Sequence, residues 1–411
     1  MLCKNYRMLP ILALMAAMWI PQLVNAQGTE KVSPLLDVQG KGGKKAVGLT
    51  PAQIKRAYGF DKINNDGKDQ TIAIIDAFDH PAIERDLAMF NNQFNLPACT
   101  TQNGCFRKVM DCGTPGCIIN PAVDDPRYQV WALEIALDVE WAHAIAPRAN
   151  ILLVEVSNDT LDVLLGGVDI AVNPPNSANV VSMSWGGPEF DGEQGAQDAH
   201  FHNPHNPNVT FFAGAGDFGH AFGTLYPAAS PYVMAVGGTR LNIDQDGNYL
   251  SEKAWSGVDG GISPFESEPD YQLDYQIPND PQHKKGIPDV AFDGAPATGV
   301  AVYDSQPYFG STGWIQVGGT SIGPPQWSGL IAIANALRAK NNQPALIGSH
   351  GVLYTAAQDR DGDAAYHDVT NGKDGNCGTL CKAKPGYDFV TGLGTPKADL
   401  LIPALRDLVD R

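Results

Sequence analysis

The sequence has few basic residues for its length. Lys and Arg together number 28 against 45 Asp and Glu in 411 residues, which gives a formal net charge of −17 at neutral pH. Because an acidic chain repels nucleic acid and anionic membrane surfaces, we expect neither as a partner. Charged residues make up only 18% of the chain, and glycines number 44. This composition is typical of a loop-rich extracellular enzyme rather than of a helical bundle or a disordered protein.

Long apolar runs are missing after the N-terminus, so no membrane-spanning helix is predicted there. Residues 1–26 have the pattern of a secretory signal, with a basic start, an apolar stretch over residues 8–20 and a small-residue cleavage site at Val24-Asn25-Ala26. The apolar stretch is shorter than the ~20 residues of a spanning helix, which disfavours a membrane anchor. We therefore expect a protein secreted to the extracellular space or the periplasm, and not membrane-bound once the signal is removed.

Cysteine is scarce, with seven residues, of which Cys3 belongs to the signal. The other six form pairs that are close in the sequence, namely Cys99/Cys105, Cys112/Cys117 and Cys377/Cys381. An even number of cysteines in an exported chain predicts disulfide bonds. Because each pair brackets a turn that contains glycine, we expect nearest neighbours to pair. A zinc site is a weaker alternative, since no histidine lies at ligand spacing near these pairs.

No linker, repeat or low-complexity tract is evident after residue 48. Residues 27–48 are polar and rich in Gly and Lys, which favours a short flexible lead-in, and residues 49–411 are expected to form a single large domain. Apolar strands are expected at 71–75, 150–156, 180–185, 209–213 and 233–236, and helices at 82–94, 130–141, 161–172 and 326–340. This alternation predicts an α/β fold with a doubly wound, mostly parallel sheet and helices on both faces.

Glycines follow two of the expected strands, at Gly186-Gly187 and from Gly214 to Asp217. Ligands of such sheets bind beyond the carboxyl ends of the strands, so these glycines mark the expected cleft. A glycine-rich strand end can also pair with an extended peptide, and we expect residues 185–187 to line a peptide groove.

A turn of small residues from Gly318 to Pro325 presents Ser321 just ahead of an apolar helical run. Such a turn exposes a hydroxyl beside free backbone N–H groups, as a serine nucleophile requires. The alternative is an ordinary helix N-terminus that Ser or Thr caps.

Two acidic elements accompany this serine. Glu134 and Asp138 are four residues apart in a helical pattern and lie on one face among large apolar residues. The two carboxylates repel each other and are poorly solvated, so one should hold a proton well above its usual pKa, which favours function over a structural ion network. Asp217 follows a strand between glycines; the alternative is a turn aspartate that accepts backbone N–H bonds.

A serine nucleophile needs a base, and none of the nine histidines lies in the His-Gly-Thr setting of subtilisin-type enzymes. Three motifs together instead resemble those of the sedolisin family of serine-carboxyl peptidases: Glu134-x-x-x-Asp138, Gly216-Asp217 and Gly319-Thr320-Ser321-x-x-x-Pro325. The resemblance extends from about Leu49 to the C-terminus. It implies a subtilisin-like fold and a peptidase that hydrolyses protein or peptide substrates at acidic pH.

The resemblance also implies a role for each motif residue. Ser321 is expected to be the nucleophile, and Glu134 the general base that takes its proton and later gives it to the leaving amine. Asp138 orients Glu134 and shares a proton with it. Asp217, when protonated, donates to the oxyanion of the tetrahedral intermediate alongside the Ser321 backbone N–H. Asp76 ends the first expected strand and is not assigned a catalytic role.

One structural Ca²⁺ ion is a further implication of the resemblance. Its expected ligands are the carboxylates of Asp368 and Asp388 and the carbonyl oxygens of Val369, Lys384 and Gly386. Oxygen ligands of this kind suit a hard cation. A second acidic cluster at residues 359–363 lacks the full spacing of an EF-hand and is expected to be a solvated turn.

The chain departs from the family in one respect. Sedolisins usually carry a long propeptide, whereas only residues 27–48 separate the expected signal from the expected domain, so the route of folding and activation stays open. Three alternatives also stay open: a tripeptidyl exopeptidase on the same fold, a neutral serine hydrolase with His143 as base, and a catalytically inactive secreted scaffold that binds calcium. We expect a monomer.

Overall fold

The structure is a computed structural model of the whole chain and describes residues 30–113, 119, 123–202, 208–278, 282–346, 350–358 and 365–408. The predicted signal, Cys117 and the acidic cluster at residues 359–363 lie outside the described residues. The helices are α1 (Pro51–Ala57), α2 (Ile83–Phe94), α3 (Pro126–Ile145), α4 (Leu161–Val172), α5 (Asp270–Tyr275), α6 (Gly323–Lys340), α7 (His350–Gln358) and α8 (Ala398–Asp407).

The central sheet has eight strands in the order β11-β10-β8-β6-β3-β5-β4, with β14 also paired to β10. Their bounds are β3 (Thr71–Ala77), β4 (Phe106–Asp111), β5 (Asn150–Val156), β6 (Val180–Met183), β8 (Thr210–Gly214), β10 (Met234–Ile243), β11 (Tyr249–Ala254) and β14 (Val290–Asp293). Every pair is parallel except β10 with β11. The prediction of a mostly parallel α/β sheet is therefore confirmed.

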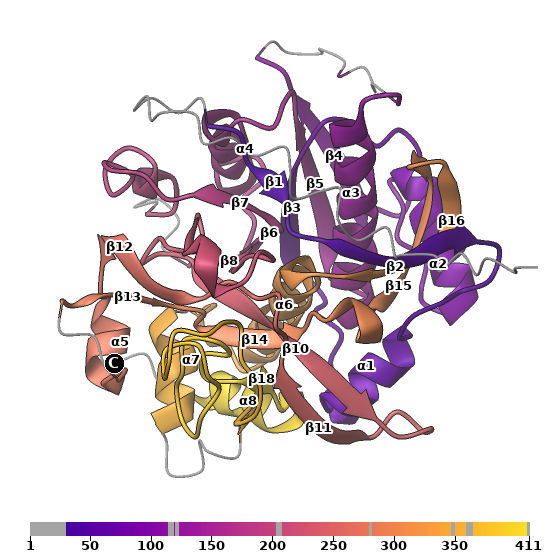
Figure 1. Cartoon of the computed structure of the whole chain (residues 1–411). Helices are drawn as coiled ribbons and strands as arrows, with labels where there is room; N and C mark the ends of the chain where they lie inside the picture. Colours follow the sequence, from indigo (N-terminus) through magenta and orange to yellow (C-terminus); the bar gives the residue numbers. More distant parts are fainter. Residues whose placement is uncertain are drawn as a thin grey trace, which may run out of the picture.

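Helices cover both faces of this sheet (Figure 1). In β3, Ile72 and Ile74 point into a core that α3 and α6 share, whereas Ala73 and Ile75 point into a second core that contains α4. Alternate side chains of a strand leave opposite faces, so a strand that is buried on both sides reads as an unbroken apolar run.

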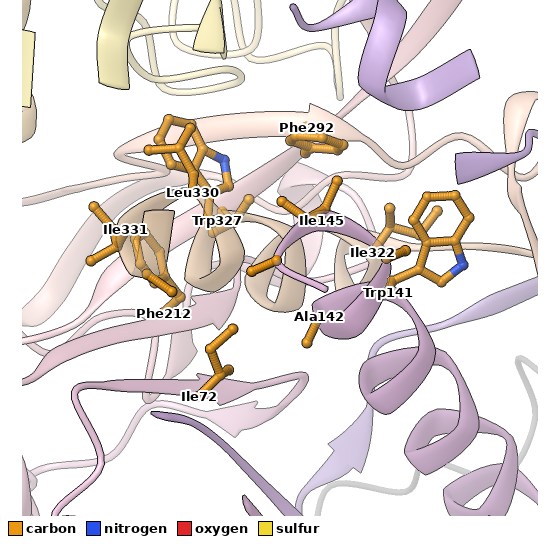
Figure 2. Packing of buried hydrophobic residues seen from close by; sticks show 14 of the residues in the cluster. Ile72, Trp141, Ala142, Ile145, Phe212, Phe292, Ile322, Trp327, Leu330 and Ile331 are labelled. Carbon is orange, nitrogen blue, oxygen red and sulfur yellow. The ribbon is translucent and has the colours of Figure 1, made fainter. Parts of the chain in front are cut away.

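Helices α3 and α6 cross closely behind the sheet. Trp327 and Ile331 of α6 lie beside Phe212 of β8, and Ile145 of α3 lies against α6 (Figure 2). The approach depends on Gly329, because a Cβ atom built there would lie 2.7 Å from a methyl carbon of Ile145. Since α3 and α6 carry opposite sides of the expected site, this crossing fixes their separation.

Residues 30–48 do not form the flexible lead-in that their composition favoured. Two strands occur here: β1 (Ser33–Pro34) pairs with β7 (Trp185–Pro188), and β2 (Asp37–Gly43) pairs with β16 (Ser311–Gly318). Figure 1 shows β1 beside β7 and β2 beside β16. The composition gave a wrong prediction because backbone hydrogen bonds to distant segments hold these strands. Such bonds do not depend on apolar side chains.

Smaller sheets accompany the central sheet. They join β1, β7 and β9 (Leu225–Tyr226), then β2, β16 and β15 (Val300–Tyr308), then β12 (Gly261–Ser267) with β13 (Lys284–Ile287), and β17 (Tyr366–His367) with β18 (Thr395–Pro396). The strand expected at 180–185 thus ends at Met183, and Trp185 begins a strand of another sheet. Disulfide bonds join Cys99 to Cys105 and Cys377 to Cys381, as predicted.

The helix crossing gives a testable prediction. We expect Gly329→Ala to lower the free energy of unfolding by about 1–3 kcal/mol, because the added methyl group pushes α6 away from α3. Gly166→Ala in α4 is the matched control: its Cβ meets nothing within 4 Å, so the helix should gain about 0.5–1 kcal/mol. Urea unfolding measures both changes, and equal effects of the two substitutions would contradict the close crossing.

Candidate active site

Helix α3 brings two carboxyl groups into the interior. The helix begins at Pro126, where the Asp125 side chain accepts a hydrogen bond from the Arg127 N–H at 2.9 Å, and nearly every residue from Trp131 onward is buried. Glu134 and Asp138 are fully buried. The poor solvation expected for this pair is therefore confirmed.

The short 3₁₀ turn Thr320–Ile322 places Ser321 against Glu134 at the start of α6. The Ser321 hydroxyl lies 2.9 Å from Glu134 Oε2 and 3.2 Å from the carbonyl oxygen of Ser184. The turn needs a glycine before it, because Gly319 has a φ of +100°. The serine and the carboxyl group are thus joined across 187 residues of sequence.

Asp138 lies behind this pair. Its Oδ1 is 2.8 Å from the hydroxyl of Ser184, which follows β6, and the same hydroxyl lies 3.2 Å from the Ser321 carbonyl oxygen. Both carboxylate oxygens of Asp76, near the end of β3, are buried and have no hydrogen-bonding partner among the described residues. The sequence argument did not find Ser184, because a serine after a strand carries no distinguishing local signal.

Burial dominates the electrostatics of these carboxyl groups. It raises the pKa of Glu134 well above its usual value, and neighbouring Asp138 and Asp76 raise it further. Burial likewise raises the pKa values of Asp138 and Asp76, and for Asp76 the negative charge of Asp138 adds to the effect. The three groups therefore retain protons at pH values where exposed carboxyl groups are ionised.

Asp217 lies on the other side of the serine turn. Its Oδ1 accepts hydrogen bonds from the Thr320 N–H and the Thr320 hydroxyl, each at 2.8 Å. Its Oδ2 is buried and has no hydrogen-bonding partner in the described part of the chain. Burial raises the pKa of Asp217 to about 7, although hydrogen bonds from Thr320 lower it. In acid the group is neutral and can donate a hydrogen bond.

Asp259 is a second buried acid beside Asp217, and the sequence analysis missed it. Burial and the neighbouring Asp217 raise its pKa to about 9. A Cβ atom on Gly216 would lie 2.0 Å from Asp259 Oδ2, so only glycine at 216 allows this approach. Gly216 is the feature of the sequence that could have indicated this close approach. A glycine by itself, however, does not identify the residue that lies against it.

The backbone N–H of Ser321, expected in the oxyanion hole, donates to the carbonyl oxygen of Leu35 at 2.9 Å. Leu35 follows β1, and its own N–H donates to the Ser184 carbonyl oxygen at 3.1 Å. A backbone carbonyl of the chain thus binds where the sequence analysis expects an oxyanion.

His143, the alternative base, faces away from this group. Its Nε2 lies 2.9 Å from the Pro97 carbonyl oxygen, and burial lowers its pKa to about 4. Its position nine residues after Glu134 on the same helix corresponds to about 13 Å along the axis. The geometry gives the alternative of a His143 base no support.

Two of the expected calcium ligands, Asp368 and Asp388, accept hydrogen bonds from one loop. The Gly386 N–H donates to Asp368 Oδ2 at 3.0 Å, and the Lys384 N–H donates to Asp388 Oδ2 at 2.9 Å. Val369 follows Asp368 directly. The two carboxylates therefore converge on residues 384–388, and an all-oxygen set of carboxylates and carbonyls fits the ligand preference of Ca²⁺.

Comparison with known proteins places this arrangement in a family. The model of the subtilase family matches residues 132–372. The chain belongs to the subtilase family, and within it to the sedolisins. It is 31% identical to kumamolisin from Bacillus sp. (strain MN-32) over 382 residues, which cover 87% of this chain and 63% of that protein. It is 29% identical to tripeptidyl-peptidase 1 from Dictyostelium discoideum over 66% of this chain and 46% of that protein.

A solved structure agrees with this placement. The Pseudomonas sedolisin, described as a serine-carboxyl proteinase complexed with two molecules of pseudo-iodotyrostatin, superposes with a TM-score of 0.72 at 26% identity, covering 88% of this chain and 99% of that one. The subtilisin-like fold is therefore confirmed. The chain spans less than two thirds of the length of the two curated relatives above.

The buried acids give a prediction for stability. Among the carboxyl groups with pKa values raised by burial are Asp76, Glu134, Asp138, Glu140, Glu155, Glu193, Asp198, Asp217, Glu252, Asp259, Glu266, Asp293, Asp374 and Asp388. The folded state holds more protons than the unfolded state above the usual carboxyl pKa, so stability falls as pH rises. For Asp217 this contribution is full below about pH 4 and is lost as pH passes about 7.

We therefore expect the melting temperature to be higher at pH 4.5 than at pH 8. Differential scanning calorimetry at constant ionic strength measures it. Asp217→Asn should lose less stability between pH 5 and pH 8 than the native chain, because its amide does not ionise. A melting temperature that rises over this range would contradict the argument.

Proposed function

We propose that this chain is a serine-carboxyl peptidase that hydrolyses peptide bonds at acidic pH through an acyl-enzyme on Ser321. The observation that carries the proposal is the buried hydrogen bond of 2.9 Å between the Ser321 hydroxyl and Glu134 Oε2. A hydroxyl group bound to a carboxyl group in a water-poor setting is arranged for proton transfer. Family membership supports the peptidase class.

In the proposed mechanism, Glu134 takes the hydroxyl proton while Ser321 Oγ attacks the scissile carbonyl carbon. Asp138, which accepts a hydrogen bond from Ser184, is the neighbouring negative charge that stabilises the proton that Glu134 gains. The oxyanion then accepts hydrogen bonds from the Ser321 N–H and from protonated Asp217. Glu134 returns the proton to the leaving amine, and a water molecule hydrolyses the ester by the same steps in reverse order.

The acidic pH preference follows from these roles. Asp217 donates only in its protonated form, which predominates below about pH 7, so activity should fall as pH rises through that value. Glu134 accepts a proton only when it is ionised, so activity should also fall as pH drops through the pKa of Glu134. Because burial raises the pKa of Glu134 well above its usual value, that lower limb should lie above the ordinary carboxyl range.

An endopeptidase is favoured over the alternative of a tripeptidyl peptidase. The segment that ends at the Leu35 carbonyl lies beside β7 through Pro34 and Ser33, and its backbone contacts continue to Glu30. The Val32 N–H donates to the Asp159 carbonyl at 3.0 Å, and the Leu161 N–H donates to the Glu30 carbonyl at 2.9 Å. The groove of a tripeptidyl peptidase has to end after the third residue before the cleaved bond. The groove of this chain instead has backbone contacts for residues beyond that position.

Secretion and calcium binding complete the proposal. The signal pattern of residues 1–26 and the two disulfide bonds support an extracellular or periplasmic location. No helix in the described part of the chain has both the length and the apolar character to cross a bilayer. One Ca²⁺ would be held by Asp368, Asp388 and the carbonyl oxygens of Val369, Lys384 and Gly386, where it would fix the loop of residues 384–388. We further propose that the protein acts as a monomer.

Digestion of denatured casein between pH 2 and pH 8 tests the mechanism. We expect an acidic maximum, no activity above background for Ser321→Ala, and a loss of at least about 100-fold for Glu134→Gln, because the amide cannot accept the proton. Glu140→Gln is the matched control. Glu140 is also buried on α3 with a raised pKa, but its Oε2 accepts from the Tyr303 N–H at 3.0 Å, so activity should be retained.

A maximum above pH 7, or equal losses for Glu134→Gln and Glu140→Gln, would overturn the carboxyl-base mechanism. A correctly folded chain without activity at any pH would favour the alternative of an inactive scaffold.

Chelation tests the calcium proposal. We expect a calcium chelator to lower the melting temperature of the purified protein and added Ca²⁺ to restore it, because binding to the folded state alone stabilises that state. Asp388→Asn should abolish the difference between chelator and Ca²⁺. A melting temperature that does not respond to either reagent would refute the site.

A further inference from the structure

Residues 216–219 form the turn that carries Asp217, and their own side chains do little to hold it. Gly216 and Gly219 have no side chains, and their φ values are +126° and +78°. Phe218 is 52% exposed, so its side chain does not anchor the turn in the core. Glycine-rich backbone of this kind is free to move unless hydrogen bonds fix it. The position of Asp217 therefore depends on the contacts of this turn with other segments.

Thr320 holds one side of the turn. Its hydroxyl oxygen accepts from the Gly216 N–H at 3.1 Å, and its N–H and hydroxyl both donate to Asp217 Oδ1 at 2.8 Å. Because Thr320 directly precedes Ser321, this side of the turn is joined to the backbone that carries the nucleophile.

Asp259 holds the other side. Its Oδ1 accepts from the Phe218 N–H at 2.9 Å, and its own N–H donates to the Gly216 carbonyl oxygen at 2.9 Å. A single residue thus binds the backbone immediately before Asp217 and immediately after it. These two bonds limit the rotation of the Asp217 backbone, and with it the direction of the Asp217 side chain.

The segment that carries Asp259 is itself fixed. The Gly257 carbonyl oxygen accepts from the Gly219 N–H at 2.9 Å, which adds a third bond between the segment and the turn. A Cβ atom on Gly260 would lie 2.0 Å from the Phe389 carbonyl oxygen, so the segment packs directly on a distant part of the backbone. Asp259 is fully buried. It is therefore a rigid support for the turn.

We propose that Asp259 is a positioning residue, whose hydrogen bonds to the backbone on both sides of Asp217 keep the Asp217 carboxyl group at the oxyanion hole. The inference rests on the proposed function and deepens it, because it adds a residue that the reaction needs without contact with the substrate. A donor stabilises an oxyanion most when it is in place before the charge develops.

Asp259 provides this support without placing a charge beside Asp217. Burial and the neighbouring Asp217 raise the pKa of Asp259 to about 9, so it is protonated at the acidic pH of the proposed reaction. Because Oδ1 accepts from Phe218, the proton belongs on Oδ2, which is buried and has no hydrogen-bonding partner among the described residues. The oxygen of an amide could replace Oδ1 in this role, whereas a methyl group could not.

Substitutions of Asp259 test the role. The probe is a quenched fluorescent peptide that spans one bond which the native chain cleaves in casein, assayed at the pH of maximal activity. Removal of a whole oxyanion donor costs about 10²–10³ in kcat, and a displaced donor should lose less. We expect Asp259→Ala to lower kcat and kcat/KM by about tenfold each, because it weakens an interaction made only in the transition state. Asp259→Asn should keep kcat within about threefold of the native value, because its amide oxygen accepts the same bond.

Glu140→Ala is the matched control. Glu140 is also fully buried, with one carboxylate oxygen that accepts from a backbone N–H and another that has no partner in the described part of the chain. Its loss should lower the melting temperature but not kcat. Should Asp259→Ala fail to fold, Asp259→Leu lacks the same acceptor but fills the space, and it should show the same loss of kcat.

A double-mutant cycle separates positioning from general destabilisation. In the Asp217→Ala background, Asp259→Ala should lower kcat by less than about twofold, because no carboxyl group is left to position. Equal losses in the two backgrounds, or a native kcat for Asp259→Ala alone, would overturn the inference and leave the proposed function standing. A native kcat for Asp217→Ala would overturn both the oxyanion role of Asp217 and the inference that depends on it.

Discussion

The structure depends on the burial of a carboxyl group against a serine hydroxyl. Glu134 is fully buried in α3, and its only favourable polar contact described here is the hydrogen bond from Ser321. A lone ionised carboxylate in such a place is costly, so the group shifts its pKa and holds a proton instead. Burial also raises the pKa values of the surrounding carboxyl groups. They therefore keep their protons at pH values where exposed carboxyl groups are ionised.

This constraint explains how the backbone around the site is built. Helix α3 has to lie inside the protein to bury Glu134, and Gly329 lets α6 approach it so that the serine turn reaches the carboxyl group. Gly319 and Gly216 leave space for Asp217 and Asp259. At each of these three glycines, a carboxyl group or a second helix approaches the backbone more closely than a side chain would permit.

The N-terminal segment lies between β7 and the serine turn. Its backbone bonds with β7 and Ser184 are those that an extended peptide of any sequence can form, whereas the Leu35 and Val32 side chains lie close to Gly214 and Gly187. The residues on both sides of the Leu35 carbonyl are paired with other strands, β1 with β7 and β2 with β16. This is the arrangement of a peptide bond within a chain rather than at its end.

The sequence by itself determined what short-range periodicity encodes: the alternation of buried strands and helices, the placement of Glu134 and Asp138 on one helix face, and the disulfide bonds between near neighbours. It also singled out Ser321 and Asp217 through their glycines. Only the tertiary structure decided that Ser184 supports Asp138, that Asp259 adjoins Asp217, and that Ser33–Pro34 and Asp37–Gly43 form strands. These contacts join segments that are distant in the sequence, and their hydrogen bonds involve backbone groups or single polar side chains, which leave no periodic signal.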